Sequence, residues 1–203
     1  MPLSPEQRNL VRVVTAIIAE RGFALAGAGA LMEHGFVSRH TEDIDLFTNI
    51  QQDVGETAAA LAERLSSEDF DVKVMRQTPH FARLSIDDLE VDLARNWRAD
   101  PVDEAEIGPL LSVRDAIAGK VEALCTRLEN RDVHDVGQLL DFYSMAQMAA
   151  WAKERDGGFS LQVTLQMVTQ NVHRPNAGFG EDAFDAARVK VLAAIEQALD
   201  QPS

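Results

Sequence analysis

The stretch Arg39–Phe47, RHTEDIDLF, places two carboxylates around a single isoleucine in an apolar setting. Asp43 and Asp45 are separated by one residue. On a β-strand their side chains would point to the same face, about 7 Å apart along the chain. Two like charges that close repel each other unless a positive charge lies between them. The stretch therefore predicts a strand that presents two carboxylates to a cation.

Magnesium is the cation that this pattern favours, because Mg²⁺ is a hard ion that prefers oxygen ligands. Two carboxylates on one strand, joined by a third from a neighbouring strand, can hold such ions beside the phosphates of a nucleotide. Asp92 in EVDLA is the expected third carboxylate, since it points to the opposite face from Val91 and Leu93. A solvated strand end is the structural alternative for these aspartates.

Two closely spaced glycines precede the carboxylate pair. Gly27 and Gly29 interrupt the apolar run LAGAGAL, just before a short helical pattern. Glycines at the start of a helix let backbone N–H groups approach a phosphate. The spacing therefore indicates a phosphate-binding turn, although Gly-x-Gly alone is more often an ordinary turn.

The composition is that of an ordinary soluble globular protein, with 46% hydrophobic and 26% charged residues among 203. The sequence has no apolar run near the ~20 residues of a membrane span, no signal-peptide pattern and a single cysteine, so we expect a cytoplasmic protein. The net charge of −14 argues against broad electrostatic binding of nucleic acid. Any nucleic-acid contact would need a local basic patch, for which the candidates are Arg83, Arg95 and Arg98.

The chain changes character near residues 100–112. Before this point, helical patterns alternate with strand-like segments, which are DIDLFTN, FDVKVMR, HFARLSI and EVDLARN. The strands are expected to stop after Pro101, and from Ser112 onward every segment has a helical pattern. We therefore predict an α+β protein, with a mixed sheet flanked by helices in residues 1–108 and a helical lobe in residues 109–203.

The segment LAGAGALMEHGFVSRHTEDIDLF resembles the signature of the nucleotidyltransferase superfamily with the DNA-polymerase-β-like fold. Its R-x-T-x-D-I-D-L-F part, which includes Arg39 and Thr41, resembles the AbiEii/AbiGii toxin-type nucleotidyltransferases, among them the mycobacterial MenT toxins. That family commonly has two adjacent glycines before a small hydroxyl residue. Here Gly27 matches the first glycine, Ala28 stands at the second, and Gly29 takes the hydroxyl position. Without the hydroxyl residue, a side-chain contact to phosphate is not expected here, whereas a backbone contact remains possible.

A second block, GKVEALCTRLENRDVHD, resembles a later motif of the same family. The motif has a lysine on a helix, an Ala-Leu pair, an arginine and then Arg-Asp-x-x-Asp. The resemblance implies that Lys120 contacts the nucleotide triphosphate and that Asp135, with Asp132 beside it, is a second polar element of the site. From the residues alone, Lys120 would be a solvated lysine on an amphipathic helix. Asp132 would be a helix N-cap, with Asp135 in the first turn.

The resemblance implies an enzyme that transfers a nucleoside monophosphate from a nucleoside triphosphate to an acceptor hydroxyl, using Mg²⁺ or Mn²⁺. It implies that the acceptor is the 3′ end of a tRNA and that a cognate antitoxin exists. The metal ligands would be Asp43, Asp45 and Asp92, joined in catalysis by Lys120 and Asp135. The nucleotide-binding residues would be Gly27, Gly29, Arg39, Thr41, Lys120 and Asp132.

The residues leave two main alternatives open; a third, a protein kinase-like transfer, is disfavoured because the sequence has no kinase Gly-rich loop or HRD-type motif. A small-molecule nucleotidyltransferase that modifies an aminoglycoside or lincosamide antibiotic would suit the acidic composition, because an aminoglycoside is cationic. A non-catalytic binding module that kept the fold is the alternative from another class. The joint presence of Asp43, Asp45 and Lys120 argues against it.

Overall fold

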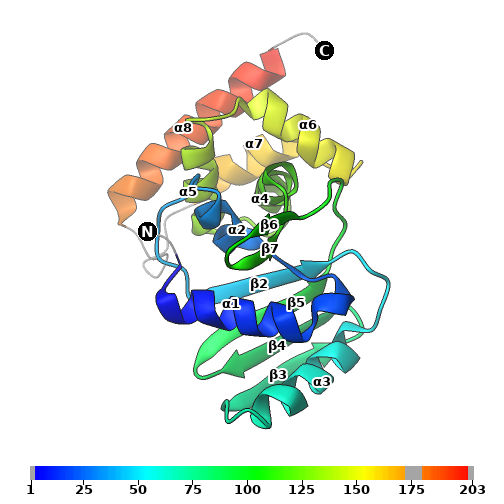
Figure 1. The fold of residues 1–203 in the computed structure, drawn as a ribbon. Helices are drawn as coiled ribbons and strands as arrows, with labels where there is room; N and C mark the ends of the chain where they lie inside the picture. Colours follow the sequence, from blue (N-terminus) through cyan, green and yellow to red (C-terminus); the bar gives the residue numbers. More distant parts are fainter. Residues whose placement is uncertain (1–2, 172–179, 201–203) are drawn as a thin grey trace. The chain divides into compact units, whose positions relative to one another are not determined.

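The computed structural model describes residues 3–171 and 180–200, which divide into two compact units (Figure 1). The sheet unit comprises the described residues up to Glu33 together with His40–Ser112. The helical unit comprises His34–Arg39 and the described residues from Val113 onward. The chain therefore enters the helical unit briefly at His34–Arg39, returns to the sheet unit, and enters the helical unit again at Val113. No helix in these two described stretches is long and apolar enough to cross a membrane.

The sheet unit begins with helices and strands in alternation and continues with a run of strands from β3 to β7. Its elements are α1 (Pro5–Ile17), a 3₁₀ turn (Ala19–Arg21), β1 (Ala24–Leu25), α2 (Gly27–Glu33), β2 (Asp43–Thr48), α3 (Val54–Ser66), β3 (Val72–Thr78), β4 (Phe81–Ile86), β5 (Leu89–Arg95), β6 (Asp103–Ala105) and β7 (Gly108–Leu110). Helix α1 begins with a capping box, in which the Ser4 hydroxyl accepts from the Gln7 N–H and the Gln7 side chain accepts from the Ser4 N–H.

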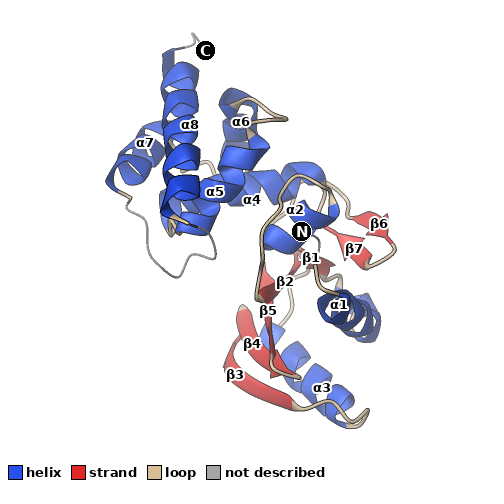
Figure 2. Cartoon of the chain, turned by 90° about the vertical axis from the view of Figure 1, so that its left-hand side faces the viewer, coloured by secondary structure: helices blue, strands red, loops and turns tan. Residues whose placement is uncertain are grey.

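The seven strands form one sheet in the order β3-β4-β5-β2-β1-β7-β6. The pairs β2–β5 and β1–β7 are parallel and the others are antiparallel, so the predicted mixed sheet with flanking helices is confirmed. Alternate residues of β4, including Leu84 and Ile86, are fully buried. Helix α3 packs against β3, β4 and β5, as Figure 2 shows. The opposite face of these strands carries Arg83, Glu90 and Asp92.

The prediction that strands stop after Pro101 is wrong, because β6 and β7 form an antiparallel hairpin there. Strand β6 consists of exposed residues and has no alternating apolar pattern, so its sequence gives no strand signal. Gly108 makes the turn possible with a φ of 118°, which favours glycine. Leu110 then pairs in parallel with Leu25, which joins the hairpin to the main sheet.

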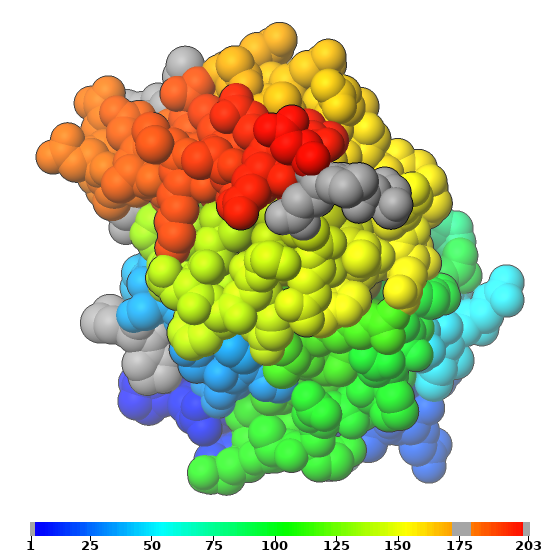
Figure 3. All heavy atoms as spheres, turned by 90° about the horizontal axis from the view of Figure 1, so that it is seen from above, coloured from blue at the N-terminus to red at the C-terminus, as the bar shows by residue number. Residues whose placement is uncertain are grey.

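The helical unit contains the elements α4 (Val113–Thr126), α5 (Asn130–Leu139), α6 (Met145–Arg155), α7 (Leu161–Gln170) and α8 (Glu181–Asp200). Helix α8, coloured orange to red in Figure 3, packs against α5, α6 and α7. Its contact with α5 is close, because a Cβ on Gly137 would lie 2.9 Å from the Cβ of Ala187. The helical character predicted for this half of the chain is confirmed for the described residues.

The segment His34–Arg39 is held to the helical unit by specific contacts. The Phe36 ring lies edge-on to Phe142 and Tyr143, with ring centres 5.1 and 5.6 Å apart. The Ser38 N–H donates to the Gln138 side chain at 2.8 Å. This segment therefore belongs to the helical unit, although it directly precedes the strand that carries the carboxylate pair.

Candidate active site

The two carboxylates of β2 lie in register with the third on β5. In this parallel pair, Asp45 is opposite Asp92 and Asp43 is opposite Glu90. Paired residues of neighbouring strands share a face of the sheet, and the strands are about 4.8 Å apart. The intervening residues Ile44 and Leu46 are buried. The structure thus brings the three predicted carboxylates onto one face of the sheet.

Gly27 lies directly against Asp45. The Ala26 N–H donates to the Asp45 carbonyl at 2.8 Å, which fixes the junction of β1 and α2 beside this residue. A Cβ on Gly27 would lie 1.9 Å from Asp45 Oδ2, and its φ of 56° is in the left-handed region. Only glycine therefore fits beside the carboxylate at this position.

Gly29 is glycine for a different reason. A Cβ there would meet the Leu25 side chain at 3.0 Å, so the residue permits close packing of α2 on β1. The first N–H groups of a helix have no carbonyl one turn earlier to bond. The backbone from Gly27 to Gly29, at the start of α2, is therefore suited to donate to an anion.

Thr41 orients Asp43. Its hydroxyl donates to Asp43 Oδ1 at 2.7 Å. Its carbonyl accepts from the Gln7 side chain at 2.8 Å, a buried hydrogen bond that links α1 to this loop. The Thr41 hydroxyl is thus directed at a carboxylate of the pair.

Arg83 on β4 forms a fork with Asp92. Its Nε donates to Oδ1 at 2.8 Å and its Nη2 to Oδ2 at 2.7 Å. A third nitrogen, Nη1, lies 3.0 Å from a Glu90 carboxylate oxygen. The pKa of Arg83 is raised, chiefly because Asp92 accepts its hydrogen bonds, and the charges of Glu90 and Asp43 add to the effect.

The three arginines expected to form a basic patch do not come together. Arg83 lies on the carboxylate face, whereas Arg95 lies on the opposite face because it is three residues beyond Asp92 on β5. Arg98 donates instead to the Gly22 carbonyl at 3.4 Å. The second arginine on the carboxylate face is Arg76, which pairs in register with Arg83. No sequence pattern indicated Arg76, because its position beside Arg83 depends on strand pairing.

The chemistry of the carboxylate face fits a magnesium or manganese ion, since it offers oxygen ligands on adjacent strands. Within residues 3–171 and 180–200, however, no three His, Cys, Asp or Glu side chains converge on one metal position. Asp92 turns toward Arg83, which explains why it does not converge with Asp43 and Asp45. The pair on β2 is therefore the part of the face best suited to hold a metal.

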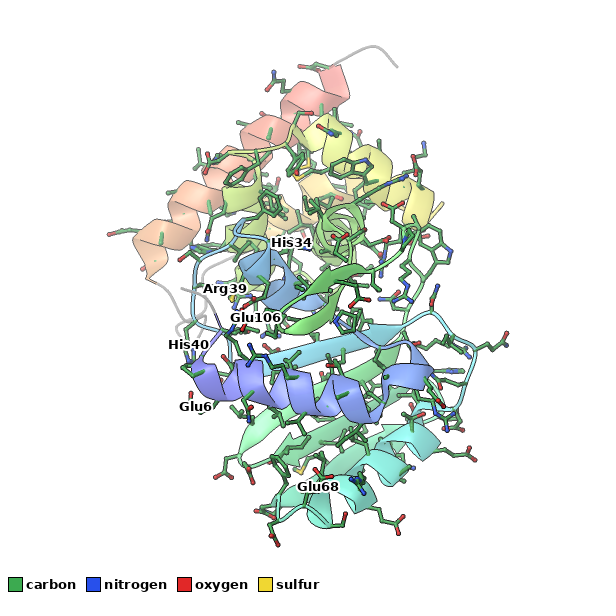
Figure 4. All side chains as sticks on the ribbon, in the orientation of Figure 1. Glu6, His34, Arg39, His40, Glu68 and Glu106 are labelled. Atoms are coloured by element: carbon green, nitrogen blue, oxygen red, sulfur yellow. The ribbon has the colours of Figure 1, made fainter. Side chains whose placement is uncertain are left out.

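The other predicted residues gather in the helical unit, around Asp135 on α5. Arg39, labelled in Figure 4, donates from Nε to Asp135 Oδ1 at 2.7 Å and from Nη2 to Oδ2 at 2.9 Å. Lys120 Nζ lies 3.0 Å from Asp135 Oδ2 and 3.0 Å from Asp132 Oδ1. Arg127 also forms a fork with Asp132, at 3.0 and 3.1 Å. The structure thus joins Arg39, Lys120, Asp132 and Asp135 in one network.

Burial and charge oppose each other in this network. Burial lowers the pKa of Lys120, but the charges of Asp135 and Asp132 outweigh it and the pKa is raised. Burial raises the pKa of Asp135, but the Lys120 charge and the Arg39 hydrogen bonds outweigh it, so the pKa is lowered. The pKa of Asp132 is also lowered, since Lys120 and Arg127 outweigh its burial. All of these groups are therefore charged at neutral pH.

Two structural alternatives raised for these residues are wrong. Lys120 is not solvated, because only 5% of it is exposed. Asp132 is not the N-cap, because α5 begins at Asn130 with Glu129 as its N-cap. Asp132 instead accepts from the Glu129 N–H at 3.2 Å, from within the first turn. The helix starts earlier than predicted because Glu129 and Asp132 form a capping box at its first turn.

Solved structures share this fold. MenT4, a nucleotidyltransferase toxin from Mycobacterium tuberculosis, matches with a TM-score of 0.59 and 13% identity over 97% of this chain and 85% of its own. JHP933 from Helicobacter pylori matches with a TM-score of 0.53 and 20% identity over 98% of this chain and 96% of its own. At these identities the likeness shows the fold, which is one that nucleotidyltransferases use. No curated protein matches the chain.

The sequence itself gives the family. Residues 10–200 match the model described as nucleotidyl transferase AbiEii toxin of a type IV toxin–antitoxin system. The chain belongs to this family of nucleotidyltransferase toxins, and the resemblance inferred from RHTEDIDLF and GKVEALCTRLENRDVHD is confirmed.

Proposed function

We propose that this protein transfers a nucleoside monophosphate from a nucleoside triphosphate to the 3′-terminal hydroxyl of a tRNA. The observation that carries the proposal is the placement of Asp43 and Asp45 on one strand, with Gly27 against Asp45 and Asp92 in register beside it. Acidic side chains next to a backbone that suits an anion are what phosphoryl transfer requires, because catalysis rests on positioning and charge stabilisation.

In this proposal Asp43 and Asp45 hold Mg²⁺ or Mn²⁺, which when bound would neutralise charge that develops on the phosphates. Thr41 keeps Asp43 oriented, and the backbone at Gly27 and Gly29 donates to the phosphates. The acceptor oxygen forms a bond to the α-phosphorus while the bond to the β-phosphate oxygen breaks, and pyrophosphate leaves. Asp92 takes the acceptor proton or completes the metal shell.

The remaining nucleotide-binding residues of this proposal belong to the helical unit. Family resemblance assigns Lys120 to the triphosphate, with Arg39, Asp132 and Asp135 supporting the nucleotide. The contacts of Lys120 with two carboxylates keep its ammonium charged and fixed in position. Arg39 presents a planar donor fork, which matches carboxylate and phosphate alike. We propose that Lys120 and Arg39, held in place by Asp132 and Asp135, supply the positive charge that balances the phosphates of the nucleotide.

A type IV toxin implies a cognate antitoxin, and we propose that this protein acts in the cytoplasm under the control of one. Modification of the 3′ end of tRNA would block aminoacylation and hence translation. Expression of the chain from an inducible promoter should arrest growth. Asp45→Asn should remove the arrest while the protein still accumulates; arrest by the variant would contradict the proposal.

The direct test uses purified protein, each α-³²P-labelled nucleoside triphosphate and total tRNA, with Mg²⁺ or Mn²⁺ present. We expect label at the 3′ end of tRNA, and none when the tRNA carries a 3′-phosphate. The net charge of −14 favours one alternative, a cationic small-molecule acceptor. Parallel reactions with aminoglycosides and lincosamides test it. Label on an antibiotic and not on tRNA would overturn the tRNA proposal in favour of that alternative.

A further inference from the structure

We propose that Arg83 is the positioning residue for Asp92 and takes the place of a second cation on the carboxylate face, so that the face binds one divalent ion. This inference rests on the proposed function, because it specifies the metal content and the proton acceptor of the same site. All of the contacts on which it rests lie within the sheet unit.

The first observation is the excess of negative charge on this face. Asp43 and Asp45 of β2 and Glu90 and Asp92 of β5 lie opposite one another in register. Four carboxylates this close would repel one another strongly without a compensating charge. Arg83 contacts two of them, Asp92 and Glu90, and its raised pKa reflects the pull of these charges. The face therefore already contains one built-in cation.

The second observation is the geometry of the fork. Both oxygens of Asp92 accept a guanidinium N–H, at 2.8 and 2.7 Å, and only 10% of its side chain is exposed. A metal ion placed on the same oxygens would be a second positive charge beside the guanidinium, and the two would repel. Asp43 and Asp45 receive no such fork from Arg83. A divalent ion is therefore expected on the β2 pair and not on Asp92.

Because the metal ion is expected on Asp43 and Asp45, Asp92 has a different role in this proposal. A carboxylate held by a bidentate arginine is fixed in orientation and kept ionised. In the proposed transfer, the acceptor hydroxyl loses a proton as its oxygen bonds to the α-phosphorus. Asp92 would accept that proton, and Arg83 would act only through Asp92. This assigns Asp92 the proton-accepting role and excludes it from the metal shell.

Arg76 provides a matched control. It pairs in register with Arg83 on the adjacent strand, and its guanidinium lies over the Phe81 ring, 5.5 Å from the ring centre. It forms no ion pair with a carboxylate among the described residues. Arg76→Gln therefore removes one positive charge from the same region without disturbing Asp92. Arg83→Gln removes the charge and the fork together, and Arg83→Lys keeps the charge but loses the fork.

The test is a titration of the full-length protein with Mn²⁺ alone, followed by electron paramagnetic resonance of the free ion. We expect one Mn²⁺ per chain for the wild type, Arg76→Gln and Arg83→Lys, and two for Arg83→Gln. Two ions in the wild type, or one in Arg83→Gln with unchanged affinity, would overturn the inference and leave the proposed function intact. No bound Mn²⁺ in the wild type, even with a non-hydrolysable nucleoside triphosphate, would instead refute the metal-dependent function.

A kinetic measurement separates positioning from a purely structural role. If Arg83 positions a proton acceptor, Arg83→Lys should lower kcat roughly 10-fold or more, with little change in KM for the nucleotide. Arg76→Gln should change neither. Equal losses in kcat for Arg83→Lys and Arg76→Gln would contradict the positioning role.

Discussion

Arg39 and Asp135, 96 residues apart in the chain, are joined by two hydrogen bonds of 2.7 and 2.9 Å. The pair is buried, with 6% of the arginine side chain and none of the aspartate exposed. Arg39 stands four residues before Asp43 in the sequence. The fork therefore connects Arg39 with the lysine and aspartates of α4 and α5 within the helical unit.

Loss of the Asp135 carboxylate should destabilise the helical unit. Asp135→Asn would leave the Arg39 and Lys120 charges partly uncompensated in a buried site, which typically costs about 3–5 kcal/mol. Urea unfolding monitored by circular dichroism measures this loss. The control is Asp141→Asn, which breaks an exposed pair with Lys190 and should cost at most about 1 kcal/mol. Similar losses for the two variants would contradict a buried network.

The same network should make stability depend on acid pH. The folded-state pKa values of Asp132 and Asp135 are lowered from 3.8, so below about pH 4 the unfolded chain binds protons that the folded chain does not. Their stabilising contribution is present above this pH and is lost as the pH falls. The raised pKa of Lys120 has the opposite effect, and its contribution is lost as the pH rises above 10.5.

The acid limb can be measured by unfolding between pH 5 and pH 2.5. Each lowered aspartate adds up to about 1.4 kcal/mol per pH unit to the slope. Asp135→Asn should therefore reduce the slope of the free energy of unfolding below pH 4 by up to that amount. An unchanged slope in this variant would show that Asp135 is not held ionised by its partners.

Gly27→Ala should inactivate the enzyme while leaving it folded. Two effects act at this position: a backbone strain of about 1–2 kcal/mol from the positive φ, and a Cβ that would occupy the place of Asp45 Oδ2. Gly35→Ala is the control, because Gly35 also has a positive φ but its Cβ would meet open space. Both variants should bear the backbone strain, and only Gly27→Ala should in addition displace the Asp45 carboxylate. If Gly27→Ala were as active as Gly35→Ala in nucleotide incorporation, the close approach of Gly27 to Asp45 would not be needed for activity.

Thr41→Val keeps the shape of the side chain and removes the hydroxyl that donates to Asp43. A hydrogen bond to a charged group contributes about 1.5–3 kcal/mol, so kcat should fall roughly 10- to 100-fold if the oriented carboxylate is needed in the transition state. Thr41→Ser, which retains the donor, should preserve most of the rate. Steady-state nucleotide incorporation measures both, and equal rates for the two variants would contradict this role.

The sequence predicted the carboxylate face because strand alternation is local. The spacing of Asp43 and Asp45, and the flanking of Asp92 by Val91 and Leu93, are enough to place each side chain on one face of its strand. Which strands pair, and in which register, depends on contacts far apart in the chain. The fork of Arg83 on Asp92 was for that reason not predictable.

Only part of the network around Asp135 could be predicted from the sequence. The family resemblance identified Lys120, Asp132 and Asp135 together, because they lie in one local motif. Arg39 was expected to bind the nucleotide, and its ion pair with Asp135 on α5 was not anticipated. Strand β6 was missed because its residues are exposed and show no apolar alternation.

The central claim is that Asp43 and Asp45 support nucleotidyl transfer. The most direct test is incorporation of α-³²P-labelled nucleotide into tRNA by the wild type, Asp43→Ala and Asp71→Asn. Asp71 is an exposed aspartate of the same unit, paired with Lys73, and serves as the charge-matched control. We predict labelled tRNA for the wild type and Asp71→Asn, and a loss of about 10³-fold or more for Asp43→Ala, because the metal contributes several kcal/mol to the transition state. Full incorporation by a folded Asp43→Ala variant would contradict the account.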